Sequence, residues 1–96
     1  MASYVVLASF TEQGIKGIKE TTKRGKAFRD TAKAMGVTIK EIYWTLGAYD
    51  VVVTLEASKE EDVAALMMKF GSFGNLKSQT LRAFNASEVD GFLSRF

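Results

Sequence analysis

The chain has 96 residues, of which 47% are hydrophobic and 25% charged, and its net charge is +2. These values fit one globular domain over residues 1–96, because chains divide into several domains only at roughly 150 residues or more. The sequence contains no cysteine and no histidine, which excludes disulfides, thiolate or imidazole metal sites, cysteine nucleophiles and Ser-His-Asp triads. No signal peptide or membrane-spanning run is recognisable, and the charge is too small to indicate nucleic acid. We therefore expect a cytoplasmic protein without metal or cofactor.

Residues Tyr4–Phe10 are rich in β-branched and aromatic side chains, which predicts a first strand. Thr11 then precedes an apolar stripe with helical spacing, so we expect it to cap one helix that ends at Gly36 in a left-handed conformation. The stripe recurs at three- and four-residue steps or their multiples: Ile15, Ile18, Thr22, Gly25, Phe28, Ala32 and Met35. Close packing of this helix on a sheet would explain the glycine at position 25.

Two strands are predicted next, Val37–Leu46 and Tyr49–Ala57, joined by the two-residue loop Gly47-Ala48 that suits a type II′ hairpin. Ser58 and Glu61 have the spacing of a capping box, which predicts that a second helix begins there.

The remaining elements complete an alternating pattern. The second helix has the apolar stripe Val63, Leu66, Met67 and Phe70, and it is closed by Gly71 and Gly74. Asn75–Phe84 reads as a fourth strand and Ser87–Arg95 as a short C-terminal helix. The order predicts an α+β, ferredoxin-like βαββαβ fold, with a four-stranded antiparallel sheet and two helices on one face. The other face of the sheet is then uncovered in a monomer.

The hairpin sorts its side chains into two faces when Leu46 is placed opposite Tyr49. The face predicted to lie beneath the helices carries Trp44, Ile42, Tyr49, Val51, Val53 and Leu55, with Lys40 opposite Leu55. The other face pairs Thr45 with Asp50, Tyr43 with Val52, Glu41 with Thr54, and Ile39 with Glu56. Such a mixed surface suits a subunit interface or the wall of a polar cavity. We therefore expect a homodimer or a larger assembly.

Several blocks of sequence occur in an order that is shared with a known family. They are Thr11-Glu12-Gln13-Gly14, Lys23-Arg24-Gly25-Lys26-Ala27-Phe28, Ala34-Met35-Gly36, Tyr43–Val52, Phe73-Gly74-Asn75-Leu76 and Thr80–Phe84. Over nearly the whole chain they resemble the GYD domain family, whose name-giving block corresponds here to Gly47, Tyr49 and Asp50, with Ala48 between the first two. The resemblance implies a small bacterial or archaeal protein with a dimeric α/β-barrel-type fold. It implies no particular activity.

Four residues are predicted to bind a ligand: Tyr43, Thr45, Asp50 and Arg82. On the uncovered face, Asp50 would orient a ligand or act as a general base. The alternative is a structural acid that accepts hydrogen bonds from the turn or pairs with Arg82. Tyr43 would bind a ligand or anchor an interface, and Trp44 is expected in the core rather than as a cofactor platform.

The first helix is basic. Its cations are Lys16, Lys19, Lys23, Arg24, Lys26, Arg29 and Lys33, and its only acids from residue 16 to residue 33 are Glu20 and Asp30. This charge would attract an anionic ligand, a nucleic acid or an acidic partner, unless it is simply a solvated helix face. Nucleic acid is not expected, because Tyr49–Glu56 lacks the aromatic motif of an RNA-recognition strand and carries two acids.

Three functions remain open from the sequence. The favoured one is a small-molecule-binding or regulatory module that works as a homodimer or larger assembly. The second is a cofactor-independent enzyme, with Asp50 as base and Tyr43 or Trp44 as the substrate wall. The third is a domain that docks a partner through the basic helix.

Overall fold

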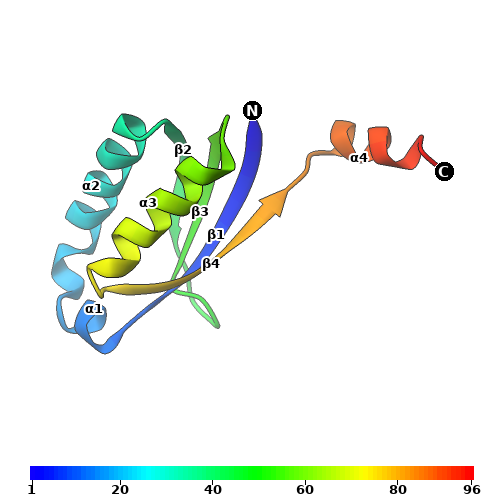
Figure 1. The fold of residues 1–96 in the computed structure, drawn as a ribbon. Coiled ribbons are helices and arrows are strands. Elements are labelled where there is room, and N and C mark those ends of the chain that lie inside the picture. Colours follow the sequence, from blue (N-terminus) through cyan, green and yellow to red (C-terminus); the bar gives the residue numbers. More distant parts are fainter.

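A four-stranded antiparallel sheet in the order β2-β3-β1-β4 forms the centre of the fold. The computed structural model describes all residues 1–96. Its elements are β1 (Ala2–Phe10), α1 (Glu12–Lys16), the 3-10 helix η1 (Ile18–Glu20), α2 (Thr21–Ala34), β2 (Val37–Trp44), β3 (Val51–Ala57), α3 (Glu60–Ser72), β4 (Leu76–Ala83) and α4 (Ala86–Leu93). Helices α2 and α3 cover the same face of the sheet (Figure 1). This is the predicted ferredoxin-like βαββαβ arrangement, with its short C-terminal helix.

The hydrophobic core lies between the sheet and the two covering helices. Alternate residues of β1 and β3 point into it, so Val6 and Leu55 are almost fully buried, and Leu66 of α3 packs over them. Each such side chain contributes about 1.5–3 kcal/mol relative to its exposed state. Phe28 of α2 meets Phe70 of α3 edge to face at 4.8 Å, which joins the two helices above the sheet.

The first helical region is broken, although the sequence pattern predicted one continuous helix. Thr11 caps α1 as expected, because its hydroxyl oxygen accepts a hydrogen bond from the Gly14 N–H (3.1 Å). Gly17 then ends α1, and the chain passes through η1 before α2 begins. Gly36 has φ of +85°, so it ends this region in the predicted left-handed conformation.

Residues 11–14 are bound to residues 73–75, and we call this pair of segments the clamp. Four hydrogen bonds join them: Thr11 N–H to Asn75 O (3.1 Å), Thr11 Oγ1 to Gly74 O (2.5 Å), Gln13 Nε2 to Phe73 O (2.8 Å) and Gln13 Nε2 to Asn75 Oδ1 (2.9 Å). A Cβ atom on Gly14 would lie 2.1 Å from the Asn75 carbonyl oxygen. The close approach therefore requires glycine at position 14.

The hairpin has the predicted register but a longer connection. Trp44 lies opposite Val51 and Glu41 lies opposite Thr54, as the face-sorting predicted. The predicted two-residue loop Gly47-Ala48 is wrong, because β2 ends at Trp44 and β3 begins only at Val51. The last pairing contact before the turn is the hydrogen bond from the Thr45 N–H to the Asp50 carbonyl oxygen (2.8 Å).

A β-bulge at Lys40 interrupts the pairing of β2 with β3. Leu55 lies opposite Ile39 and not opposite Lys40 as predicted. Ile39 is therefore buried in the core, whereas the prediction placed it opposite Glu56 on the uncovered face. The extra residue lets Lys40 reach Glu56 at 3.3 Å in a partly exposed ion pair. The physical reason is that an ammonium group is costly to bury, while isoleucine gains from burial.

The N-cap of α3 differs from the prediction. Ser58 was predicted to cap α3, but Lys59 occupies the N-cap position and no side chain caps the helix. Glu60, Glu61 and Asp62 in the first turn offset the unpaired N–H groups through the helix dipole instead. A capping box does occur at the start of α4. There Asn85 Oδ1 accepts from the Glu88 N–H (2.9 Å), and the Glu88 carboxylate accepts from the Asn85 N–H (3.1 Å).

Helix α4 projects away from the rest of the molecule on an extension of β4 (Figure 1). Its contacts with the preceding segment are an edge-to-face pair of Phe84 with Phe92 (4.9 Å) and an ion pair of Arg82 with Glu88 (3.8 Å). The radius of gyration is 14.5 Å, compared with about 12.5 Å for a compact chain of this length. No helix combines the length and apolar character that crossing a bilayer requires.

Candidate functional site

The predicted ligand residues do not form one cluster. Tyr43, Thr45 and Asp50 lie together at the turn end of the hairpin, where Thr45 is opposite Asp50 and Tyr43 is opposite Val52. Arg82 lies on the outer strand β4, where it pairs with Tyr4 of β1. Tyr43 and Val52 are in line with Leu7 of β1, which is three residues further along that strand. Ligand binding by these four residues stays a prediction.

Asp50 continues the sheet where β3 has ended. Its N–H donates to the Ala8 carbonyl oxygen (2.9 Å), and its carboxylate oxygen Oδ2 accepts from the Phe10 N–H (2.9 Å). The side chain thus takes the place of the next residue of a strand, because it satisfies the last N–H of β1 on that side. The Thr45 hydroxyl donates to the Tyr49 carbonyl oxygen (2.6 Å) and holds the same turn.

Arg82 makes several contacts near the point where the C-terminal segment leaves the sheet. Its guanidinium donates to the carbonyl oxygens of Ser3 (3.1 Å) and Ala83, and it forms the ion pair with Glu88. It also lies 4.3 Å from the centre of the Phe84 ring, in a cation–π contact. The alternative in which Arg82 pairs with Asp50 is therefore wrong.

The uncovered side of the sheet, which we call the open face, has a mixed composition as predicted. Strand pairing places on it Val5, Leu7, Val52, Thr54, Glu41, Tyr43, Gln79 and Leu81. Tyr43 is 54% exposed and Leu81 is 40% exposed, whereas Val5, Leu7 and Val52 are half-buried among their neighbours. An apolar strip with polar edges on an open sheet is typical of a surface that another protein covers.

Trp44 and Tyr49 were both predicted to lie in the core beneath the helices. Trp44 does lie on the helix side, where its ring packs over Gly25 and its indole N–H donates to the Thr21 hydroxyl oxygen (2.9 Å), but it is 43% exposed. The prediction for Tyr49 is wrong. It belongs to the turn, and its hydroxyl reaches Gln79 of the open face at 3.4 Å.

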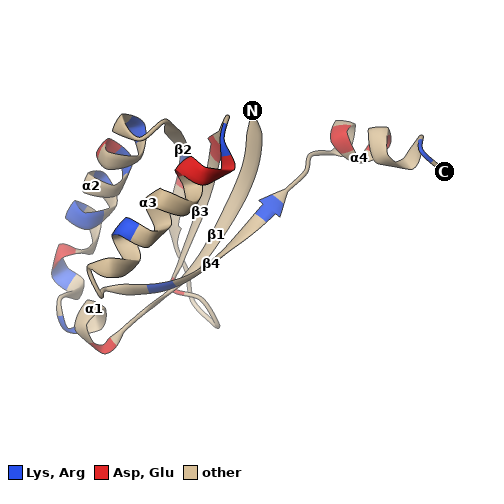
Figure 2. Cartoon of the chain, in the orientation of Figure 1, with Lys and Arg blue, Asp and Glu red and all other residues tan.

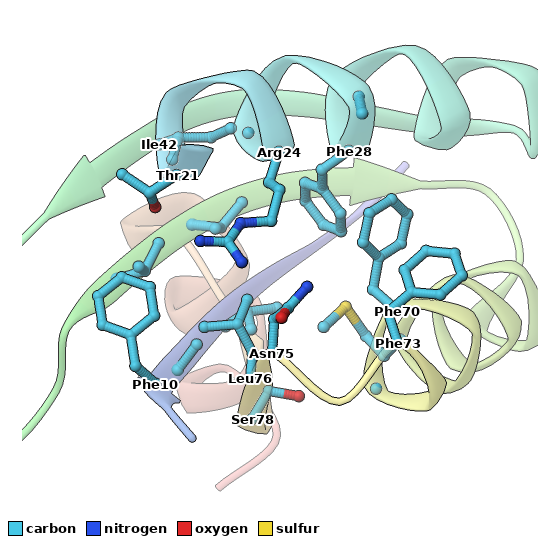
Figure 3. Close-up of a pocket in the computed structure, with 18 of the residues that line it drawn as sticks. Phe10, Thr21, Arg24, Phe28, Ile42, Phe70, Phe73, Asn75, Leu76 and Ser78 are labelled. Carbon is cyan, nitrogen blue, oxygen red and sulfur yellow. The ribbon is translucent and has the colours of Figure 1, made fainter. Parts of the chain in front are cut away.

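A cleft lies on the helix side of the sheet. Its volume is about 420 Å³, and it opens between α2, α3 and the sheet (Figure 3). The lining is mostly apolar and aromatic, and its aromatic members are Phe10, Phe28, Trp44, Phe70 and Phe73. The sequence did not reveal this cleft, since several of its lining residues, such as Phe28, Phe70 and Val53, read as ordinary core positions.

The charged residues of the cleft lining are both cations, Arg24 and Lys69, and no acid lines it. Arg24 points into the cleft (Figure 3), and its Nη2 donates to the carbonyl oxygens of Gly14 (3.3 Å) and Gly17 (2.5 Å). The sequence placed Arg24 among the cations of the first helix. Its position four residues before the buried Phe28, on the same helical face, was the available signal that it points inward.

The outward surface of η1 and α2 carries a different set of cations (Figure 2). Lys19, Lys23, Lys26 and Lys33 are all exposed, and of these only Lys23 forms an ion pair, with Glu20 (3.4 Å). We call Lys19, Lys23 and Lys26 the basic surface.

Comparison with known proteins agrees with the fold and identifies the family. A relative from Thermus thermophilus, named glutamine synthetase and cystathionine beta-lyase binding protein, is 29% identical over 90 residues, which are 93% of this chain and 95% of the relative. Two crystal structures are similar in fold. FFRP-DM1 has a TM-score of 0.58 and 19% identity, with 88% of this chain and all of the other covered. A second protein from Thermus thermophilus has a TM-score of 0.56 and 20% identity, with 90% and 96% covered. The GYD domain matches residues 4–93, and the chain therefore belongs to the GYD domain family.

Proposed function

We propose that this chain is a regulatory binding protein, which associates with itself through the open face and docks on a metabolic enzyme through the basic surface. The observation that carries the proposal is the match along almost the full length of both chains to the Thermus relative, which is named for binding two enzymes. Because the two chains cover each other nearly completely, we expect the binding surfaces of the relative to have counterparts in this chain.

Self-association is supported by the open face. Its strip of half-buried and exposed apolar side chains lies on the side of the sheet that no helix covers. A chain of this length has a small core, so covering this strip would add stability. Burial of Leu81, Leu7 and Val52 against the same residues of a second copy gives a two-fold, self-complementary contact.

Leu81→Glu is expected to dissociate the assembly. The carboxylate would be buried without a partner in the contact, while in the monomer it stands exposed on the outer strand and costs little. Light scattering after size exclusion should show a multiple of 10.6 kDa for the unmodified chain and the monomer mass for the variant. Met68→Glu makes a similar change on the exposed surface of α3 and should leave the mass unchanged. A monomeric unmodified chain would refute self-association.

Docking on an enzyme is supported by the positive charge of the basic surface, in which only Lys23 has an acidic partner. Such a surface suits an acidic patch on a partner. Charge reversal by Lys19→Glu, Lys23→Glu and Lys26→Glu together is expected to weaken binding to the enzyme by at least about tenfold, since repulsion replaces attraction. The probes are the glutamine synthetase and the cystathionine β-lyase of the source organism, immobilised for interferometry. The affinity of the unmodified chain should also fall with added salt.

The control for this experiment reverses three exposed cations outside the basic surface, at Lys33, Lys59 and Arg95, so that the net charge changes by the same amount. Enzyme binding should survive in the control. If both triple variants bind equally weakly, overall charge and not the basic surface governs the interaction. If the unmodified chain binds neither enzyme, the proposed docking is wrong.

The alternative of a cofactor-independent enzyme with Asp50 as its base receives less support. The carboxylate already accepts the Phe10 N–H, and this bond favours the structural role that the sequence left open. We therefore do not extend the proposal to catalysis.

A further inference from the structure

The cleft between α2, α3 and the sheet has the size and the walls of a small-molecule site. Its volume of about 420 Å³ lies in the range of roughly 300–1,000 Å³ that such sites occupy. Phe28, Phe70 and Phe73 form a continuous edge-to-face series along one side, with ring centres 4.8 and 5.2 Å apart. Trp44 and Phe10 also line the cleft. Flat apolar groups pack well against such rings.

Arg24 and Asn75 offer the cleft hydrogen-bond donors that no protein atom accepts. Arg24 forms no ion pair, and its hydrogen bonds to protein both come from Nη2, so the N–H groups on Nε and Nη1 have no protein acceptor. The Asn75 carbonyl Oδ1 is occupied by Gln13, while its NH₂ group donates to no protein atom. Arg24 donates to the Gly14 carbonyl and Gly14 packs against Asn75, so both residues lie in the same part of the cleft, whose lining Figure 3 shows. Their free donors therefore face a cavity that contains no acid.

We propose that the cleft binds a small organic acid, whose carboxylate is held by Arg24 and Asn75 and whose aromatic or aliphatic body lies among the phenylalanine rings. A carboxylate supplies the acceptors that both residues lack, and hydrogen bonds to a charged group are the stronger kind. A cationic ligand would meet Arg24 and Lys69, both of the same sign. The proposal is separate from docking on an enzyme, since the basic surface lies on η1 and α2 and none of its residues lines the cleft.

The ligand class can be tested with three probes of one shape: 3-phenylpropionate, its neutral amide, and the cation 3-phenylpropylammonium. Trp44 is the only tryptophan in the chain and lines the cleft, so its fluorescence reports occupancy directly, and calorimetry gives an independent affinity. The acid should bind saturably. The amide should bind roughly tenfold to a hundredfold more weakly, the size of a lost charged hydrogen bond. The ammonium probe should not compete with the acid. Equal binding of acid and amide, or no saturable binding of either, would overturn the proposal.

Two substitutions locate the site. Arg24→Met should remove the preference for acid over amide, while Lys26→Met, two residues along the same helix and outside the cleft, should leave it intact. If both variants lose the preference equally, the general charge of α2 attracts the anion and the assignment to Arg24 is wrong.

Arg24 also donates to the Gly14 and Gly17 carbonyls, so Arg24→Met carries a risk for folding. Ser78→Phe avoids that risk, because residue 78 is exposed on β4 and lines the cleft. The new phenylalanine ring should fill the cavity and abolish the binding of 3-phenylpropionate and of its amide. Circular dichroism and enzyme docking should be unchanged in this variant. Undiminished binding of 3-phenylpropionate to Ser78→Phe would place the ligand elsewhere and refute the site.

Discussion

Gly14→Ala is expected to destabilise the protein by about 3 kcal/mol, the upper part of the range for forcing an extra carbon into a packed site. The new Cβ would lie 2.1 Å from the carbonyl oxygen of Asn75, and that atom belongs to the backbone. A side chain could turn away, but here α1 or the start of β4 must shift. Such a shift would stretch the hydrogen bonds of the clamp, including the one from the Thr11 hydroxyl to the Gly74 carbonyl.

Urea unfolding followed by circular dichroism would measure this change, at one protein concentration because self-association alters apparent stability. Gly71→Ala provides the matched control. A Cβ at position 71 meets no atom within 4 Å, and the residue lies in α3, so alanine should stabilise the protein by about 0.5–1 kcal/mol. Equal effects of the two substitutions would show that the clamp does not hold α1 against residues 73–75.

Asp50→Ala is expected to cost about 1–3 kcal/mol, because the Phe10 N–H would lose its acceptor in a partly buried position. Asp50→Asn keeps an oxygen at the same place and should lose much less. The same denaturant titration measures both variants. Tyr43→Phe removes a polar group from the same end of the hairpin without touching this hydrogen bond, and it should be nearly neutral.

The comparison of alanine with asparagine tests the structural role that the sequence left open for Asp50. A neutral acceptor needs only an oxygen, which asparagine keeps and alanine lacks. If Asp50→Asn were as unstable as Asp50→Ala, the charge rather than the oxygen would matter. The account of Asp50 as a replacement strand residue would then be wrong.

The fold was predictable because several independent signals agreed. The alternation of apolar residues in β1 and β3 and the helical stripe around Phe28 each specify one buried face. The hairpin register was predictable for a related reason. A shift by one residue would have placed Asp50 among the apolar partners of Trp44, at a large energetic cost.

The failures arose where tertiary contacts outweigh local pattern. Nothing local marks Lys40 as a bulge, because the bulge is set by the burial of Ile39 on one side and by the ion pair with Glu56 on the other. Ser58 has the right spacing to cap α3, but the chain begins that helix one residue later. Tyr49 read as a strand residue because aromatic side chains favour strands, and its actual partner, Gln79, is far away in sequence.

The cleft was hidden for a different reason. Its walls include side chains that the sequence assigned correctly to the helix side of the sheet, such as Ile42, Val51 and Val53. A cavity among them depends on how far α2 and α3 stand apart. That separation is a property of packing and not of periodicity. Arg24 was visible as a cation on the same helical face as Phe28, and the structure shows that it points into the cleft, which Lys26 does not line.

The position of β1 has a consequence for the newly made chain. Of the four strands, this one is synthesised first, yet its two partners are β3 on one side and β4 on the other, the last two of the four to be made. Until residue 83 has emerged, β1 keeps an unpaired edge rich in valine and leucine, and such edges pair with other chains. Ribosome pausing within β4 would therefore prolong the interval in which the protein is most prone to aggregate.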